Sequence, residues 1–200
     1  IGARPAENHP VAATYLKNAA KRGAKLIVMD PRGQNQGIGR YASHVLNFAP
    51  GRDVALLNAM LHTIVEEGMV DVQYIQAMTE GYDGLKAKIR DFSPEAMEPI
   101  CGIPAETIKE VARLYARSER SIIFWGMGVS QHTHGTDNAR CLIALALITG
   151  QVGRPGTGLH PLRGQNNVQG ASDSGLIPMM FPDYQRVDNP EANKRFEKLW

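Results

Sequence analysis

The chain has 200 residues, of which 43% are hydrophobic and 21% charged, and its formal net charge is +2. This composition supplies a sizeable core and excludes a disordered, collagen-like or disulfide-stapled chain, and the near-neutral charge argues against a dedicated nucleic-acid-binding protein. The longest apolar run, residues 141–148, is too short for a membrane span, which takes ~20 residues.

The first third of the sequence predicts a βαβ unit. Residues 1–2 look like the end of a strand whose first part is missing, and a turn follows over residues 3–10. The apolar spacing over residues 11–22 predicts a helix, and Gly23 is expected to end it. The β-branched apolar run at residues 26–29 is typical of a buried parallel strand.

Helices and strands are expected to alternate along the rest of the chain. Helices are predicted over residues 53–67, 71–98 (as several small ones), 104–115 and 137–149, and strands over residues 45–48 and 122–125. Residues 150–158 are expected to form a long loop, and residues 163–175 show neither a helical nor a strand period. This order indicates an α/β fold with an open, mostly parallel sheet flanked by helices.

The cysteines and histidines predict no metal site. Cys101 and Cys141 are far apart and match no zinc-ligand spacing. His132 and His134 would face the same way only on a strand, and the glycines around them favour a loop.

Ligands of open parallel sheets bind beyond the carboxyl ends of the strands, and Asp30 and Arg32 follow a predicted strand there. Asp30 could accept hydrogen bonds from ribose hydroxyls or a base edge, and Arg32 could reach a phosphate. The alternative is an ordinary turn started by Asp-Pro. Residues 2–5 lack the GxGxxG pattern, so simple NAD-type binding is not indicated.

Two glycine-containing turns are further candidates. Gly51 and Asp53 begin a predicted helix and could hold a nucleotide through an N–H and a carboxylate, or could simply cap that helix. Residues 126–128 follow a predicted strand and could let a ligand approach the backbone closely, or could form a tight turn. Both alternatives stay open for each turn.

Residues 163–170 combine an arginine with carboxamides and glycines. Packed carboxamides favour a buried polar network around a ligand with many hydrogen-bonding edges. Arg163 would be its single charge and is suited to a small carboxylate. The alternative is an ordinary solvated loop.

Several of these segments resemble one known family. Residues 125–131, 147–158 and 161–170 resemble the catalytic subunit of molybdopterin-dependent formate dehydrogenases, as do residues 5–10 and 30–32. The resemblance covers essentially the whole chain. The first two segments are typical of the wider molybdopterin oxidoreductase superfamily, whereas residues 163–170 are closer to its formate dehydrogenases than to its nitrate reductases.

The resemblance implies oxidation of formate to CO2, with two electrons passing to Mo or W in a bis(molybdopterin guanine dinucleotide) cofactor. The positions that match one guanine-nucleotide site are Glu7, Asp30, Arg32, Gly51 and Asp53. Met127 and Gln131 match positions along the pterin and pyrophosphate, and Gln165 matches one at the cofactor. Arg163 matches the catalytic arginine that orients formate beside the metal.

The resemblance also implies a division of the chain. Residues 1–162 would form the guanine-dinucleotide-binding domain, with a truncated first strand, and residues 163–200 the active-site loop and the start of a neighbouring domain. Arg4 departs from the family, which usually has Asn there. The metal-ligating Cys or selenocysteine and the cysteines of a 4Fe-4S cluster are expected upstream, so this piece alone is expected to be inactive.

The expected partners are formate, the remaining part of the same catalytic subunit and electron-transfer subunits. No export signal is visible, so a cytoplasmic location is the default expectation. The alternatives are another molybdopterin oxidoreductase, such as a nitrate reductase-like enzyme, and a non-catalytic nucleotide-binding module.

Overall fold

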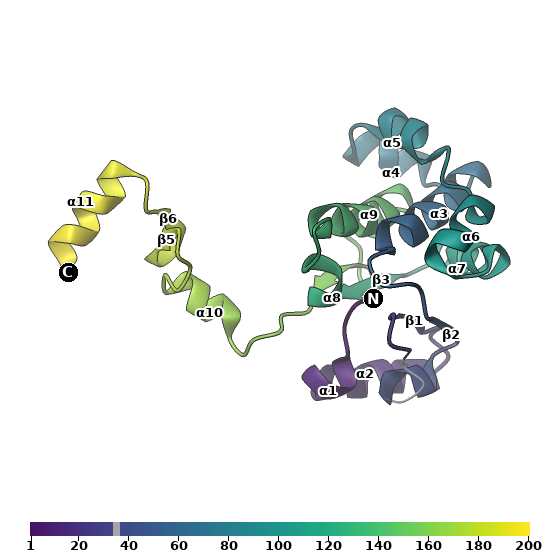
Figure 1. Cartoon of the computed structure of the whole chain (residues 1–200), viewed down its shortest axis with the longest axis horizontal. Coiled ribbons are helices and arrows are strands. Elements are labelled where there is room, and N and C mark those ends of the chain that lie inside the picture. Colours follow the sequence, from purple (N-terminus) through teal and green to yellow (C-terminus); the bar gives the residue numbers. More distant parts are fainter. Residues whose placement is uncertain (34–36) are drawn as a thin grey trace. The chain divides into compact units, whose positions relative to one another are not determined.

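The computed structural model describes residues 1–33 and 37–200, which divide into two units, Ile1–Leu162 and Arg163–Trp200 (Figure 1). The helices of the first unit are α1 (Pro5–Asn8), α2 (Pro10–Lys21), η1 (Gly37–Tyr41), α3 (Asp53–Glu66), α4 (Val72–Met78), α5 (Tyr82–Ile89), α6 (Pro94–Cys101), α7 (Ala105–Arg117), α8 (Met127–Ser130) and α9 (Gly135–Ile148). Its strands are β1 (Ile27–Met29), β2 (His44–Leu46), β3 (Ile122–Trp125) and β4 (Gly158–Pro161). No helix of the described part is long and apolar enough to cross a bilayer.

The strands form two parallel pairs, β1 with β2 and β3 with β4. The backbone of Ile1 and Gly2 joins these pairs. The Ile1 nitrogen donates to the Phe124 carbonyl at 2.8 Å, and Gly126 N–H donates to the Ile1 carbonyl at 3.3 Å. On the other side, Gly2 N–H donates to the Met29 carbonyl at 3.2 Å. The order is therefore β2–β1–residues 1–2–β3–β4, which confirms the predicted α/β class with an open parallel sheet.

Both faces of this sheet are covered, as is usual for parallel strands. Successive residues of β1 point to opposite faces: Val28 packs in a small cluster with Ala13 of α2, and Met29 packs in the large cluster around α3. The alternation explains why β1 is apolar throughout rather than at every second residue.

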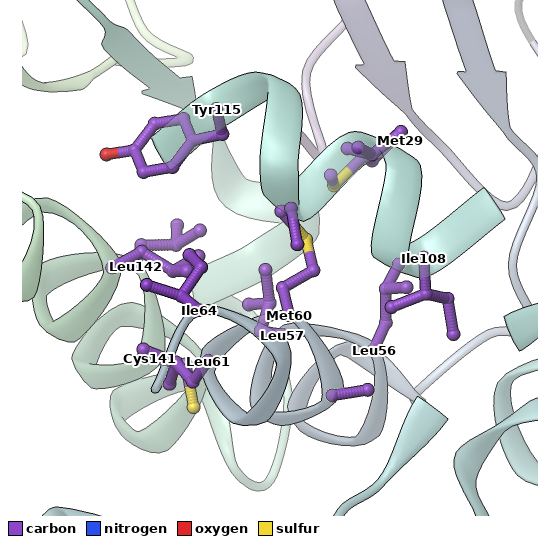
Figure 2. Close-up of a cluster of buried hydrophobic side chains, with 14 of the residues drawn as sticks. Met29, Leu56, Leu57, Met60, Leu61, Ile64, Ile108, Tyr115, Cys141 and Leu142 are labelled. Carbon is purple, nitrogen blue, oxygen red and sulfur yellow. The ribbon is translucent and has the colours of Figure 1, made fainter. Parts of the chain in front are cut away.

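Helix α3 is the centre of the large core, packed against α6, α7 and α9. Leu57, Leu61 and Ile64 on α3 are almost fully buried, and their three- and four-residue spacing brings them to one side of the helix. Figure 2 shows this side facing Leu142 of α9, with Ile108 of α7 beside Leu56. A helix that is buried on most sides must be apolar on most sides, as α3 is.

The second unit contains α10 (Val168–Asp173), β5 (Met180–Phe181), η2 (Pro182–Tyr184), β6 (Gln185–Arg186) and α11 (Pro190–Leu199). Its small core is a stack of Phe181 on Phe196, with ring centroids 4.5 Å apart, and Trp200 packs against both rings. Asn189 caps α11 by accepting from the N–H groups of Glu191 and Ala192.

The structure confirms most predicted elements and corrects three, of which the first is the turn expected over residues 3–10, where the short helix α1 forms. The expected loop over residues 150–158 ends in strand β4, which sequence reasoning missed because Gly158 and Pro161 are poor strand formers and the strand exists only by pairing with β3. Residues 163–175 show no helical period in the sequence, and the expectation that they form no helix is wrong, because α10 lies in this segment. This helix is short and lacks an apolar stripe, but Ser172 and Gln169 stabilise it with i,i+4 hydrogen bonds.

A buried glutamine anchors the start of β3. Gln151 is only 2% exposed; its Oε1 accepts from Ser121 N–H at 2.9 Å and its Nε2 donates to the Ser118 carbonyl at 2.9 Å. The side chain thus satisfies backbone groups of the turn between α7 and β3 that no neighbouring strand reaches.

Replacing this side chain is therefore expected to destabilise the first unit. Gln151→Ala leaves two partly buried backbone groups without their partner and should lower the free energy of unfolding by about 2 kcal/mol. Urea denaturation measures the change. Gln76→Ala, at an exposed position of α4, is the matched control and should stay within about 0.5 kcal/mol of wild type. Equal effects at the two positions would contradict the anchoring role.

Candidate functional site

The carboxyl edge of the sheet is organised around the place where the strand order changes direction, between residues 1–2 and β3. In doubly wound sheets the ligand crevice lies at this point. The backbones of the two loops touch there: Gly128 N–H donates to the Gly2 carbonyl at 3.1 Å. A Cβ on Gly128 would lie 2.6 Å from that carbonyl oxygen, and one on Gly2 would lie 2.7 Å from the Val129 nitrogen.

This contact decides between the two interpretations of the turn at residues 126–128. The glycines are needed because the turn packs against the protein's own backbone at Gly2, whether or not a ligand approaches. The tight-turn interpretation is sufficient, and it also explains why the chain enters the short helix α8 so abruptly after β3.

A residue that sequence reasoning missed holds this turn in place. Asn138 of α9 is 3% exposed, and its Nδ2 donates to the Val129 carbonyl at 2.8 Å. It therefore links α9 to α8, which carries Met127. The sequence signal that could have found it is a carboxamide on a buried side of a mostly apolar helix. Such a group points to a structural role because a buried carboxamide requires a hydrogen-bond partner.

Asp30 lies directly after β1 and is 2% exposed. Its Oδ1 accepts from Arg32 N–H at 2.8 Å, and the Arg32 Nε lies 3.5 Å from the same oxygen. The Asp-Pro turn, which the sequence left open as the alternative to ligand binding, is therefore present. The Arg32 side chain is 67% exposed, so its guanidinium has donors available to an anion outside the fold.

Asp53 is the first residue of α3 and is also 2% exposed. Burial of the carboxyl raises the pKa of Asp53, while its own backbone N–H and the nearby His132 lower it. A group that only caps a helix is normally in contact with water, so this depth is unusual. Gly51 precedes it with φ +73 and open space around its Cβ position, which leaves its backbone accessible.

The two aspartates belong to one neighbourhood. The Ile1 nitrogen interacts electrostatically with both Asp30 and Asp53. His132, considered above only for metal binding, borders the same region: its Nε2 lies 2.8 Å from the Gly128 carbonyl oxygen. No group of three or more His, Cys, Asp or Glu side chains in the described ranges converges as a metal site.

The other predicted site residues lie as follows. Glu7 on α1 is exposed and its carboxylate lies 2.7 Å from the Arg4 guanidinium. Gln131 is exposed at the end of α8. Arg163 and Gln165 belong to the second unit, where both are exposed. The carboxamides of residues 163–170 are thus not buried among the residues described, and the expected buried polar network is not formed by this unit itself.

The raised pKa of Asp53 predicts a stability that depends on pH. Because folding favours the protonated carboxyl, this group contributes stability at low pH, and the contribution is lost as pH rises through the raised pKa. Asp53→Asn should therefore raise the urea midpoint at pH 7, and the difference from wild type should shrink toward pH 4. Asp91→Asn, at an exposed carboxyl, is the control and should show no such trend. A lower midpoint for Asp53→Asn at pH 7 would contradict the prediction.

The chain is similar in sequence to several known proteins. The chain is 44% identical over 200 residues to the F420-dependent formate dehydrogenase subunit alpha of Methanocaldococcus jannaschii and 41% identical to formate dehydrogenase H of Escherichia coli. It covers 29% and 28% of those proteins, so it spans less than a third of their length. It is also 32% identical over 202 residues to a nitrate reductase of Synechocystis.

Among solved structures, acetylene hydratase from Pelobacter acetylenicus is similar with a TM-score of 0.66 and 27% identity, over 72% of this chain and 19% of that one. The family model of the molybdopterin oxidoreductases matches residues 1–199. Members of that family carry a molybdopterin cofactor with Mo or W. Together with the parallel sheet and its ligand edge, this match shows that the chain belongs to the molybdopterin oxidoreductase family.

Proposed function

We propose that this chain is part of the catalytic subunit of a formate dehydrogenase. The observation that carries the proposal is the difference in identity among its relatives, which is 40–44% for formate dehydrogenase alpha subunits and 32% for a nitrate reductase. Residues 163–170 support the same choice. In the complete enzyme, formate is oxidised to CO2, which releases one proton and two electrons.

The donor and acceptor set at the carboxyl edge fits one guanine nucleotide of a bis(molybdopterin guanine dinucleotide). Asp30 and Asp53 offer carboxylate oxygens, which accept hydrogen bonds from the N–H edge of guanine or from ribose hydroxyls. A carboxylate at the N-terminus of α3 disfavours a phosphate there, so a base or a ribose suits this end of the site better. The exposed Arg32 guanidinium suits a phosphate.

The remaining predicted contacts complete this arrangement. Glu7 and the open backbone at Gly51 would lie at the same nucleotide, and Met127 and Gln131 along the pterin and pyrophosphate. Gln165 is proposed as a further cofactor contact, as its match to the family motif implies. When bound, the molybdopterin cofactor with Mo or W would supply the two-electron redox chemistry of formate oxidation, and a 4Fe-4S cluster expected in another part of the subunit would supply the route to electron-transfer subunits.

Arg163 is the proposed catalytic residue of this chain. Its guanidinium has a planar fork of donors that matches the two oxygens of formate. It would fix the orientation of formate and compensate its negative charge while the C–H bond breaks. This role requires an accessible guanidinium, and Arg163 is exposed.

Substitution of Arg163 tests the catalytic proposal in the complete subunit. Arg163→Ala should retain its metal content and lose formate turnover by tens to several hundred-fold, equivalent to roughly 2–4 kcal/mol of lost stabilisation. Arg163→Lys keeps the positive charge but not the planar fork of donors, so its formate turnover should lie between those of wild type and Arg163→Ala. Arg195→Ala, an exposed arginine of the same unit, is the control. Near wild-type turnover of Arg163→Ala would refute the role.

The nucleotide site can be tested without turnover. Asp30→Asn preserves an oxygen that accepts from Arg32 N–H but removes the charge, so the turn should persist while binding to the guanine edge weakens. We expect a dissociation constant for guanosine diphosphate about tenfold higher than that of wild type, because a charge-assisted hydrogen bond becomes a neutral one. Isothermal titration provides the measurement. Asp188→Asn is the exposed control, and unchanged affinity of Asp30→Asn would remove Asp30 from the site.

A further inference from the structure

The hairpin loop of the second unit holds a tyrosine in an unfavourable backbone conformation. Asp183 and Tyr184, between β5 and β6, have φ values of +60 and +53, in the left-handed region. Hairpin loops with two such residues normally use Asn-Gly or Asp-Gly, because a bulky L side chain is strained there. A turn that only reversed the chain would be better formed with glycine at position 184, so the strain at Tyr184 points to a use of its side chain.

The Tyr184 hydroxyl joins this loop to helix α10, which lies beside it (Figure 1). The hydroxyl oxygen accepts from Gln169 Nε2 at 3.0 Å, and the same nitrogen donates to Asp173 Oδ1 at 3.1 Å. Because a carboxamide nitrogen has two hydrogens, Gln169 can make both bonds at once, one along the helix and one to the loop. The first turn of α10 is therefore tied to the hairpin.

A second contact ties the other end of α10 to the same loop. Gly175 follows the helix with φ +85, and a Cβ there would lie 2.7 Å from the Pro182 nitrogen. The backbone after α10 thus packs directly on the hairpin loop. The loop is itself anchored, because Phe181 next to it stacks on Phe196 of α11. Contacts at both of its ends fix the direction of α10 within the second unit.

The first turn of α10 sets the course of the residues before it. Asn167, with φ +49, leads the chain into the helix, and its carbonyl accepts from Ala171 N–H at 3.0 Å. A Cβ on Gly170 would lie 2.8 Å from the Asn167 side chain, so this turn is closely packed. Arg163 precedes Asn167 by a few residues in the sequence. A rotation of the turn would therefore move the backbone that carries Arg163.

We propose that Tyr184 is a positioning residue for Arg163. Through Gln169 it fixes the first turn of α10, and this turn directs the segment that presents the Arg163 guanidinium to formate. The inference rests on the role of Arg163 proposed above. The Tyr184 hydroxyl contacts Gln169 and acts on Arg163 only through the helix. This use of the hydroxyl accounts for a tyrosine at a position whose φ favours glycine.

Kinetics of the complete subunit test the proposal. Tyr184→Phe keeps the ring and removes the hydroxyl, so the KM for formate should rise about three- to tenfold, the effect of losing one neutral hydrogen bond, with unchanged metal content. A merely structural role would instead reduce the amount of active enzyme, which lowers the apparent kcat and leaves the KM as it was. Tyr15→Phe, at an exposed tyrosine of α2, is the matched control and should change neither constant.

A double variant tests the route through Gln169. Adding Tyr184→Phe to Gln169→Ala should raise the KM no further than Gln169→Ala does alone, because the partner of the hydroxyl is already absent. Hydrogen exchange in the complete subunit gives a readout that does not depend on turnover. The Ala171 amide should exchange about three- to tenfold faster in Tyr184→Phe and at the wild-type rate in Tyr15→Phe.

Three results would each overturn the proposal. They are an unchanged KM for formate in Tyr184→Phe, unchanged exchange of the Ala171 amide in the same variant, and a full additional effect of Tyr184→Phe in the Gln169→Ala background. If one of them occurs while Arg163→Ala still loses its turnover, the positioning role fails and the proposed function stands. Near wild-type turnover of Arg163→Ala would remove both.

Discussion

The fold depends on the backbone of two residues, Ile1 and Gly2, which joins two parallel strand pairs into one sheet. An isolated two-stranded pair is at best marginally stable in water, whereas a wider sheet with both faces covered can bury a core. Because these residues bond to β1 on one side and to β3 on the other, they fix the positions of the helices that follow each strand. The large core around α3 draws on both pairs, including Met29 of β1 and Ile123 of β3.

The same constraint determines the chemistry available at the carboxyl edge. Where the central backbone leaves the sheet it touches the turn after β3, and only glycine fits at positions 2 and 128. Asn138 of α9 stabilises that turn through a single hydrogen bond to the Val129 carbonyl. The ligand proposed for this edge would meet a rigid surface whose shape is set by backbone contacts, with Asp30 and Asp53 as the proposed acceptors. Rigid placement of this kind lowers the entropic cost of binding.

Sequence patterns predicted the elements that owe their stability to local spacing and burial, such as α3, α7 and β1. They failed where the stabilising partner is distant in the sequence. β4 contains Gly158 and Pro161 and exists because β3 is beside it, and the role of Gln151 becomes visible only when the turn before β3 is placed against the end of α9. The candidate aspartates were located correctly at strand and helix ends, because Asp30 follows an unmistakable apolar strand.

What sequence could not do was separate structural from ligand-binding roles, since both place the same residue types at the same positions. The structure separates them through burial and contact. The glycines at 126 and 128 are explained by the backbone they touch. Asp53 is different, because burial raises the pKa of its carboxyl, and its own backbone N–H and the nearby His132 offset this effect only in part. Groups with perturbed pKa values cluster at functional sites, so this burial favours Asp53 as a member of the nucleotide site proposed above.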